Sequence, residues 1–493
     1  MFVFSGIGFI FRFFPIFLIA YYAVPARFRN TILLIGSIVF YAMGEPHFIV
    51  LLLAMTVLNY LLALIGEKTR KRLLEKQKME QMTDEALSAI YQVSMNTRMQ
   101  NGVVTRGNTR HSRADRLILA LAVVLDIGLL TAAKALALTQ AVPGFHLPLG
   151  MSFYVFRMVS FQADLYRGKT GSRLSFINTA AYFTMFPQVT QGPIMRYGEG
   201  GFGDPAARKI NWGRFEDGAV YFVIGLAMKI LLADRLGILW NELSKIGYES
   251  VSTPLAWLGL YGYSFELYYD FWGYSLMAAG IGMMLGFDFI ENFRHPYAAG
   301  SVSEFYRRWH ITLGSWFRDY LYIPLGGSRK NSFVTVRNLF LVWLATGLWH
   351  GGTLNFVIWG LVLGVIIILE KFPLKEWLGF LPFLGRVGVL ILIPLSWGVF
   401  AISDLNRLSV FFTRLFPFFE EYGNVNPHDF VKYVSTYWPM FAAGVLLLIP
   451  GVYGFIVRKR RNPVVVILLA ALFWVSVYYS SISSQNVFMY YGF

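Results

Sequence analysis

The chain is predicted to be an all-α membrane protein that crosses the bilayer several times. Of its 493 residues, 56% are hydrophobic and only 14% are charged, and the mean hydropathy is +0.52. A soluble domain normally carries about 25% charged residues and could not bury this much apolar surface in one core. Inside a bilayer the backbone must satisfy its own hydrogen bonds, which apolar segments of ~20 residues do as helices.

Apolar segments recur along the whole chain, and we expect about a dozen of them to cross or enter the membrane as helices. Clear examples are residues 2–24, 48–65, 117–137, 218–233, 356–369 and 464–479. The first is not expected to be a cleaved signal peptide, because it lacks a basic region and many further segments follow it. No internal repeat is visible, so residues 1–493 are expected to form a single membrane domain.

Lysine and arginine collect between the apolar segments, where the positive-inside rule assigns them to the cytoplasm. These basic positions are Arg27 and Arg29, the stretch 67–116, Arg167, Lys169 and Arg173, Lys371 and Lys375, and the stretch 458–461. The pattern predicts that both termini lie outside the cytoplasm and that the aromatic tail 480–493 emerges there.

Residues 67–116 form a long basic insertion, which we assign to the cytoplasmic side. The pattern of residues 68–90 is typical of a charged amphipathic helix, and we expect this helix to lie on the inner membrane surface. A surface feature is favoured here over a docking site for a partner.

Composition and motifs exclude several classes of function. The net charge of +15 does not indicate a nucleic-acid partner, because the basic residues lie in loops and no base-stacking motif accompanies them. The absence of cysteine removes disulfides, thiolate metal sites and a thioester on the protein itself. No His-Glu-x-x-His pattern, Walker-type phosphate loop or Gly-x-Ser-x-Gly elbow occurs, so neither a metal nor a bound cofactor is expected.

Charged residues within apolar segments mark a polar cavity or an ion pair, since an isolated charge is costly in lipid. Glu266 and Asp270 are four residues apart and would share one face of a helix. With Ser275 they line a polar tunnel, or they pair with basic residues of neighbouring segments. The sequence favours neither alternative.

Two segments have interrupted helical character. Residues 186–197 contain two prolines and a glycine together with Gln188, and such backbone at membrane depth must be enclosed by protein or line a water-filled cavity. We expect a re-entrant loop there. Residues 320–329 are broken in the same way and end at Arg329, which suits an anionic group at the cytoplasmic mouth of a tunnel.

Two histidines stand beside tryptophans in otherwise apolar surroundings, within Arg-Arg-Trp-His at 307–310 and Leu-Trp-His-Gly at 348–351. Histidine titrates near neutral pH and can move a proton during a reaction. These segments contribute the candidate site residues Arg307, Arg308, Trp309, His310, Trp349 and His350. Taken alone, a histidine in an apolar segment is more often a satisfied packing group than a catalyst. The arginines and Trp309 also fit an interfacial belt.

Seven motifs, in this order along the chain, resemble the membrane-bound O-acyltransferases, and within them the bacterial alginate O-acetyltransferase type. Proteins that acetylate peptidoglycan or transfer D-alanine to teichoic acid are similar. The motifs are Leu-Gly-Met-Ser-Phe-Tyr at 149–154, Phe-Pro-Gln at 186–188 with Gly-Pro at 192–193, Asp-Phe-Trp-Gly-Tyr-Ser at 270–275, Glu-Asn-Phe at 291–293, and the segments 307–310, 317–327 and 348–351. The resemblance implies a ring of tilted helices with re-entrant segments around a central tunnel or funnel.

The resemblance also implies a reaction. His350 matches the family's catalytic histidine and is expected to act as the base, and His310 matches a second motif position, where it would orient the donor or stabilise developing charge. The donor would be a cytoplasmic thioester, acetyl-CoA or an acyl carrier protein. The acceptor would be a hydroxyl of a cell-envelope polysaccharide outside the plasma membrane of a bacterium, reached directly or through a partner transferase.

The C-terminal hexapeptide 488–493 is similar to one found in relatives that work with an extracytoplasmic transferase, which makes Tyr490 a possible acyl relay. An aromatic anchor at the membrane interface is the alternative. Two other classes of function stay open: a transporter of a lipid-linked sugar or small anion, and a non-catalytic scaffold of a glycan-modifying complex.

Overall fold

The computed structural model describes residues 2–94, 112–170, 174–208, 211–376, 381–418 and 425–482. Within these ranges every regular element is a helix, as predicted. The N-terminal part of the chain contains η1 (Phe9–Phe13), α1 (Phe14–Ala23), η2 (Ala26–Phe28), α2 (Arg29–Gly44), α3 (Ile49–Ser94), α4 (Arg113–Thr139), α5 (Met151–Tyr166), α6 (Phe176–Thr184), α7 (Phe186–Val189) and η3 (Pro205–Ala207).

The middle of the chain forms one long helix, α10, and several short ones. Its elements are α8 (Trp212–Ala227), η4 (Met228–Ala233), α9 (Asp234–Ile246), η5 (Tyr248–Ser250), α10 (Thr253–Met284), η6 (Pro296–Ala298), α11 (Val302–Arg308), α12 (Ile311–Phe317) and η7 (Arg318–Tyr322). The C-terminal part contains α13 (Ser332–His350), α14 (Leu354–Lys371), α16 (Pro382–Ala401), α17 (Leu405–Leu415), α18 (Phe430–Leu448), α19 (Pro450–Arg458) and α20 (Pro463–Ile482).

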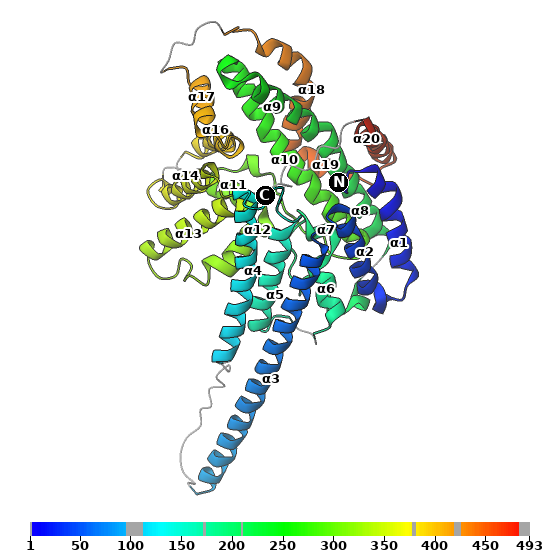
Figure 1. The fold of residues 1–493 in the computed structure, drawn as a ribbon, viewed down its shortest axis with the longest axis vertical. Coiled ribbons are helices and arrows are strands. Elements are labelled where there is room, and N and C mark those ends of the chain that lie inside the picture. Colours follow the sequence, from blue (N-terminus) through cyan, green and yellow to red (C-terminus); the bar gives the residue numbers. More distant parts are fainter. Residues whose placement is uncertain are drawn as a thin grey trace.

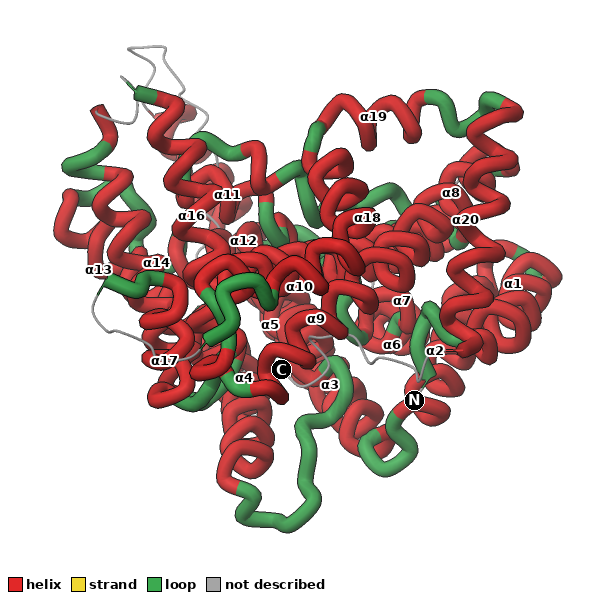
Figure 2. The backbone as a smooth tube through the Cα atoms, turned by 90° about the horizontal axis from the view of Figure 1, so that it is seen from above, coloured by secondary structure: helices red, strands yellow, loops and turns green. Residues whose placement is uncertain are grey.

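Helix α10 runs across the middle of the molecule (Figure 1). Figure 2 shows α13, α14 and α16 on one side of it and α1, α2 and α20 on the other. Nearly all of α10 is buried, including its aromatic residues Tyr268, Phe271 and Trp272. Two large clusters of buried apolar side chains both draw residues from this helix. The candidate site is therefore built around an internal scaffold helix.

Six helices in the described residues are long and apolar enough to cross a membrane, or up to seven if the bent pair α18 and α19 counts as one span. They are the 49–73 part of α3, α4, α13, α14, α16 and α20. This number is smaller than the dozen segments expected from hydropathy. The difference arises because apolar sequence also marks helices buried inside the protein, such as α5, in which residues 151–165 are all buried.

The predicted helix of the basic insertion is present, but its predicted orientation is wrong. Helix α3 is one continuous helix of 46 residues. Figure 1 shows its C-terminal part continuing on the same axis and projecting from the rest of the molecule. A helix that continues a span along its own axis cannot lie flat on the membrane surface. Residues 95–111 of the insertion lie outside the described residues.

Both interrupted segments are non-helical where the sequence predicts a break. Helix α7 ends at Val189, and the chain then runs without helix to Tyr197, enclosed by protein over almost its whole length. The π-helical turn η7 is followed by turns up to the start of α13. Enclosure of the first segment supplies the hydrogen-bond partners that lipid lacks, whereas the second segment is largely exposed.

Glycines let α8 and α10 approach closely. A Cβ atom at Gly218 would lie 2.5 Å from the carbonyl oxygen of Gly280, and a Cβ atom at Gly280 would collide with the backbone of Gly218. Close approach through small residues is the usual way in which membrane helices gain packing energy.

We predict that Gly280→Leu destabilises the protein by about 1–3 kcal/mol, because backbone atoms cannot move aside for the new side chain. The matched control is Gly128→Leu in α4, where a Cβ atom would meet nothing within 4 Å. The thermal unfolding midpoint of both variants in the same detergent is the measurement. Equal midpoints would contradict the packing argument.

Candidate active site

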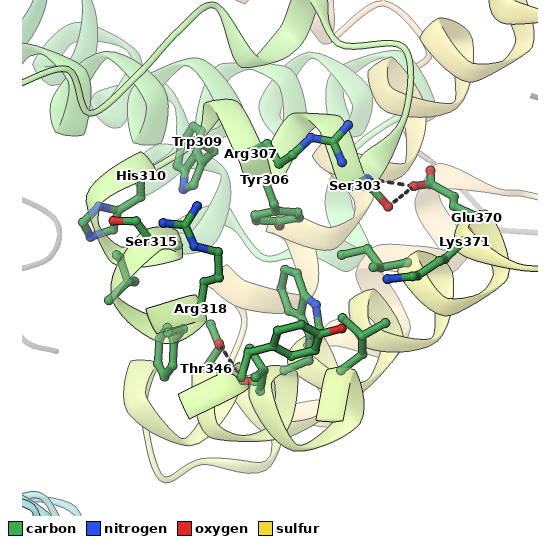
Figure 3. A pocket seen from close by; sticks show the side chains of 18 of the residues that line it. Ser303, Tyr306, Arg307, Trp309, His310, Ser315, Arg318, Thr346, Glu370 and Lys371 are labelled. Atoms are coloured by element: carbon green, nitrogen blue, oxygen red, sulfur yellow. Dashed lines mark hydrogen bonds between the residues drawn. The ribbon is translucent and has the colours of Figure 1, made fainter. Parts of the chain in front are cut away.

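An open cavity of about 1370 Å³ is lined by α11, α12, η7, α13, α14 and the residues that follow α14. His310 and His350 both line it, although 40 residues separate them in the sequence. Trp309 and Arg307 line it as well. Figure 3 shows Arg318 and Lys371 extending into this cavity from different sides, with His310 at the end away from Glu370 and Lys371. The tertiary structure therefore brings together the two histidine motifs.

His310 occupies the break between α11 and α12. Its backbone is left-handed, with φ 45° and ψ 55°, a conformation that costs free energy for a residue with a side chain and persists only where the surroundings enforce it. The backbone of the 292–294 segment does so. The Ile311 N–H donates to the Asn292 carbonyl oxygen at 2.9 Å, and the Arg294 N–H donates to the Arg308 carbonyl oxygen at 2.9 Å.

The side chain of His310 is only 3% exposed. Its Nδ1 lies 3.0 Å from Oδ1 of Asn292, and its Nε2 has no hydrogen-bond partner among the described residues. The ring packs against Phe271, with ring centroids 4.6 Å apart, and faces Phe153 at 6.5 Å. This imidazole is thus held by one polar contact within an aromatic enclosure.

His350 is the last residue of α13 and lies in an aromatic enclosure of its own. Its ring centroid is 4.5 Å from that of Trp349, and 5.0 Å from those of Trp359 and Phe400. Lys134 from α4 donates a hydrogen bond to the carbonyl oxygen of Trp349. That contact attaches the end of α13 to a neighbouring helix and fixes the position of the histidine.

Basic side chains also line the cavity, Arg318 on the side of His310 and Lys371 at the opposite end (Figure 3). They are Arg307, Arg318, Lys371 and Lys375. Among the described residues, the one acidic side chain of the lining is that of Glu370, which accepts hydrogen bonds from the Val302 and Ser303 N–H groups, both at 2.7 Å, and from the Ser303 hydroxyl. Glu370 is therefore engaged by the start of α11, and the lining has an excess of positive charge suited to phosphate groups.

The membrane-bound O-acyltransferase family model matches residues 37–402. The chain belongs to this family. A probable alginate O-acetylase AlgI of Pseudomonas fluorescens is 36% identical over 373 residues, which are 75% of this chain and 66% of the relative. The peptidoglycan O-acetyltransferase of Helicobacter pylori is 29% identical over a match that covers 74% of this chain and 69% of the relative's length. The teichoic acid D-alanyltransferase of Bacillus subtilis is 27% identical over a match that covers 46% of this chain and 60% of the relative's length.

Membership of the membrane-bound O-acyltransferases confirms the resemblance inferred from the seven motifs. The match to the alginate O-acetylase spans just under two thirds of that relative's length. The family model, which covers residues 37–402, includes every element that lines the cavity.

Other predicted site residues of this membrane-bound O-acyltransferase lie near the cavity without lining it. The Trp349 ring lies near both histidines, with its centroid 6.5 Å from that of the His310 ring and 4.5 Å from that of the His350 ring. Arg308 points elsewhere and pairs with Glu304. Arg329 is exposed in the loop before α13 and is not part of the cavity lining, to which Arg318, Lys371 and Lys375 belong.

Asp270 and Glu266 do not line the cavity, and the structure supports the ion-pair alternative for Asp270. The Nζ of Lys229 lies 2.5 Å from Oδ1 of Asp270 and 2.7 Å from Oδ1 of Asp234. Lys229 sits on the π-helical turn η4, which turns its side chain toward α10. Glu266 faces the neighbouring Gly237 of α9. These acidic groups connect helices and belong to the scaffold.

Gln188 and Ser275 also lie outside the large cavity. Gln188 is buried in α7. Ser275 lines a separate cavity of about 110 Å³ together with Asn292, and its hydroxyl oxygen accepts a hydrogen bond from Nδ2 of Asn292 at 2.9 Å. Ser275 is thereby two hydrogen bonds away from His310. Tyr490 falls outside the described residues.

Asn292 and Arg318 are site residues that the sequence-based candidates omit. Each lies within a segment that carries the family resemblance, 291–293 and 317–327, yet neither has a composition or spacing that indicates its role. Asn292 contacts His310 across 18 residues, which no local pattern reveals.

We predict that Lys229→Met lowers the free energy of unfolding by about 3–5 kcal/mol, because it leaves Asp234 and Asp270 buried without their cation. The control is Arg294→Met, which removes an exposed pair with Glu291 worth at most about 1 kcal/mol. Unfolding in detergent, followed by tryptophan fluorescence, measures both. If Lys229→Met lowers the free energy of unfolding no more than Arg294→Met does, Lys229 and the two aspartates do not form a stabilising buried ion pair.

Proposed function

We propose that this protein is an O-acyltransferase that moves an acetyl group from a cytoplasmic thioester across the plasma membrane of a bacterium to a hydroxyl of an extracytoplasmic polysaccharide. The single observation that carries the proposal is the shared cavity, whose lining contains two imidazoles and several basic side chains. Acyl transfer needs a proton acceptor and a site for an anionic carrier, and the cavity offers both.

The donor is acetyl-CoA or an acyl carrier protein. Both present a thioester at the end of a long arm that begins at a phosphate. Arg307, Lys371 and Lys375 suit the phosphate, and the arm would extend along the cavity toward His310 and His350. Lys371 and Lys375 belong to a turn that the positive-inside rule assigns to the cytoplasm, which supports donor entry from that side.

In the reaction, the acceptor oxygen attacks the carbonyl carbon of the thioester, the carbon–sulfur bond breaks, and the hydroxyl proton passes to a base. That proton then moves to the leaving thiolate, so the carrier departs as a thiol. His350 is the base that the family resemblance indicates, and His310 lines the same cavity. The aromatic rings around both histidines exclude water, which favours transfer to the acceptor over hydrolysis of the donor.

The acceptor belongs to the cell envelope. The relatives are named for alginate, peptidoglycan and teichoic acid, three different envelope polymers, and these names support a glycan hydroxyl as the acceptor class. Transfer is direct or passes through an extracytoplasmic partner transferase, with Tyr490 as the proposed relay in the second case. Both termini are proposed to lie outside the cytoplasm.

We predict that His350→Gln and His310→Gln each lower the turnover number by about 10²–10⁴-fold, the contribution expected from a group that moves or stabilises charge at the reacting centre. Purified protein in lipid is given labelled acetyl-CoA and an oligosaccharide acceptor. The control is His428→Gln, whose side chain is exposed in a distant loop.

Two outcomes would overturn the proposed function. Undiminished labelling in both histidine variants would show that neither imidazole takes part, and absence of labelling with the wild type would favour a scaffold. Movement of a sugar or anion across the membrane without any acyl transfer would favour a transporter.

We predict that Lys371→Gln raises KM for acetyl-CoA about tenfold with little change in kcat, because the lost contact is to a phosphate and not to the reacting atoms. Raising the salt concentration should reduce the difference from the wild type. Lys459→Gln, in the exposed turn after α19, is the matched control. A change in kcat with unaltered KM would contradict the placement of the donor phosphate.

A further inference from the structure

We infer that Asn292 is a positioning residue that holds His310 in the tautomer whose Nε2 accepts a proton. The inference rests on the proposed acyl transfer for its function, and on hydrogen-bond geometry for its structure. Asn292 is 3% exposed and lies in the segment between α10 and η6. Its side chain stands between the large cavity, which His310 lines, and the small cavity, which Asn292 and Ser275 line.

The orientation of the Asn292 amide follows from the donors that face it. The backbone N–H of Thr312, which can only donate, lies 3.3 Å from Oδ1 of Asn292. The Thr312 hydroxyl oxygen accepts a hydrogen bond from the Ile194 N–H at 3.0 Å. The hydroxyl can therefore donate its hydrogen to Oδ1 of Asn292, which lies 2.9 Å away. Two donors thus converge on one amide atom, which must therefore be the oxygen.

The opposite end of the amide agrees with this orientation. Nδ2 of Asn292 donates to the hydroxyl oxygen of Ser275 at 2.9 Å. A reversed amide would place its NH₂ group against the Thr312 N–H and leave two buried donors face to face, neither with an acceptor. The amide is consequently fixed at both ends and cannot rotate to serve His310 differently.

The tautomer of His310 then follows. Oδ1 of Asn292 has no hydrogen, so the ring nitrogen that faces it at 3.0 Å, Nδ1, must carry the proton. In a neutral imidazole the other nitrogen, Nε2, then holds a lone pair. Nε2 is buried and has no hydrogen-bond partner among the described residues. It is an acceptor atom on a ring that lines the cavity.

This arrangement assigns His310 the accepting role in the proposed reaction. A neutral ring protonated at Nδ1 cannot donate a hydrogen bond from Nε2 to an oxyanion, so the hydrogen-bond donor role expected for His310 is replaced by that of a proton acceptor. His350 takes the proton of the acceptor hydroxyl as the hydroxyl oxygen bonds to the carbonyl carbon, and Nε2 of His310, which lines the same cavity, receives that proton in turn and passes it to the thiolate sulfur released from the carrier. The oxygen of Asn292 stabilises the imidazolium formed in between.

The kinetic test compares two substitutions at Asn292. Asn292→Ala removes the acceptor at Nδ1, and we expect kcat to fall by about 10²–10⁴-fold with KM for acetyl-CoA within threefold of the wild type. Asn292→Asp keeps an oxygen at Nδ1 and should restore kcat to within about tenfold of the wild type. The control is Asn30→Ala, which removes a buried asparagine hydrogen-bonded to Asn178 and to the Phe202 carbonyl oxygen and should leave kcat unchanged.

A structural readout tests the tautomer without any activity. In protein carrying ¹⁵N-labelled histidine rings, the His310 signals are assigned by their loss in His310→Gln. The wild type should show a protonated Nδ1 and an unprotonated Nε2, and Asn292→Ala should show a substantial population protonated at Nε2. A wild-type ring protonated at Nε2, or a kcat for Asn292→Ala equal to that of the wild type, would overturn the inference. Absence of acyl transfer in the wild type with the expected ¹⁵N signals would overturn the proposed function and leave Asn292 as the group that sets the tautomer.

Discussion

The candidate site depends on one constraint: a polar group removed from water must find its hydrogen-bond partners within the protein. Asn292 satisfies this constraint for several neighbours at once. Its backbone oxygen receives the N–H of Ile311, and its side-chain oxygen receives donors from Thr312 and His310. The break between α11 and α12 is stable because of these bonds, and it places His310 in the wall of the cavity.

Aromatic packing supplies the second requirement of such a site, a rigid and dry enclosure. Trp309 belongs to one cluster of buried side chains and Trp349 to the other, and His310 lies at their boundary, touching Phe271 on one side and facing Phe153 on the other. Helices drawn from distant parts of the chain therefore converge at the two histidines. The buried group around Lys229 holds α10, the helix that both clusters share.

Several properties could be predicted from the sequence because they depend on local pattern. Hydropathy indicated the helical membrane fold, although it overestimated the number of spans, since apolar side chains also occur in helices buried inside the protein, such as α5. Prolines and glycines located the break after α7. The basic insertion was recognised as helical, but its direction depends on the continuity of α3, which no amphipathic pattern reveals. The paired tryptophan–histidine motifs identified both residues that meet in the cavity.

The sequence by itself determined the class of protein, the family and the two histidines, because composition, helix length and ordered motifs are properties of residues near one another in the chain. Only the tertiary structure decided that Asp270 pairs with Lys229, that Arg318 and Lys371 supply charge to the cavity, and that Asn292 faces His310. Those contacts join residues from 18 to more than 40 positions apart, and they exist because helix packing closes the distance in space. The nitrogen of the His310 ring that carries the proton depends on which atom faces it. That atom belongs to Asn292, which only the folded chain brings next to His310.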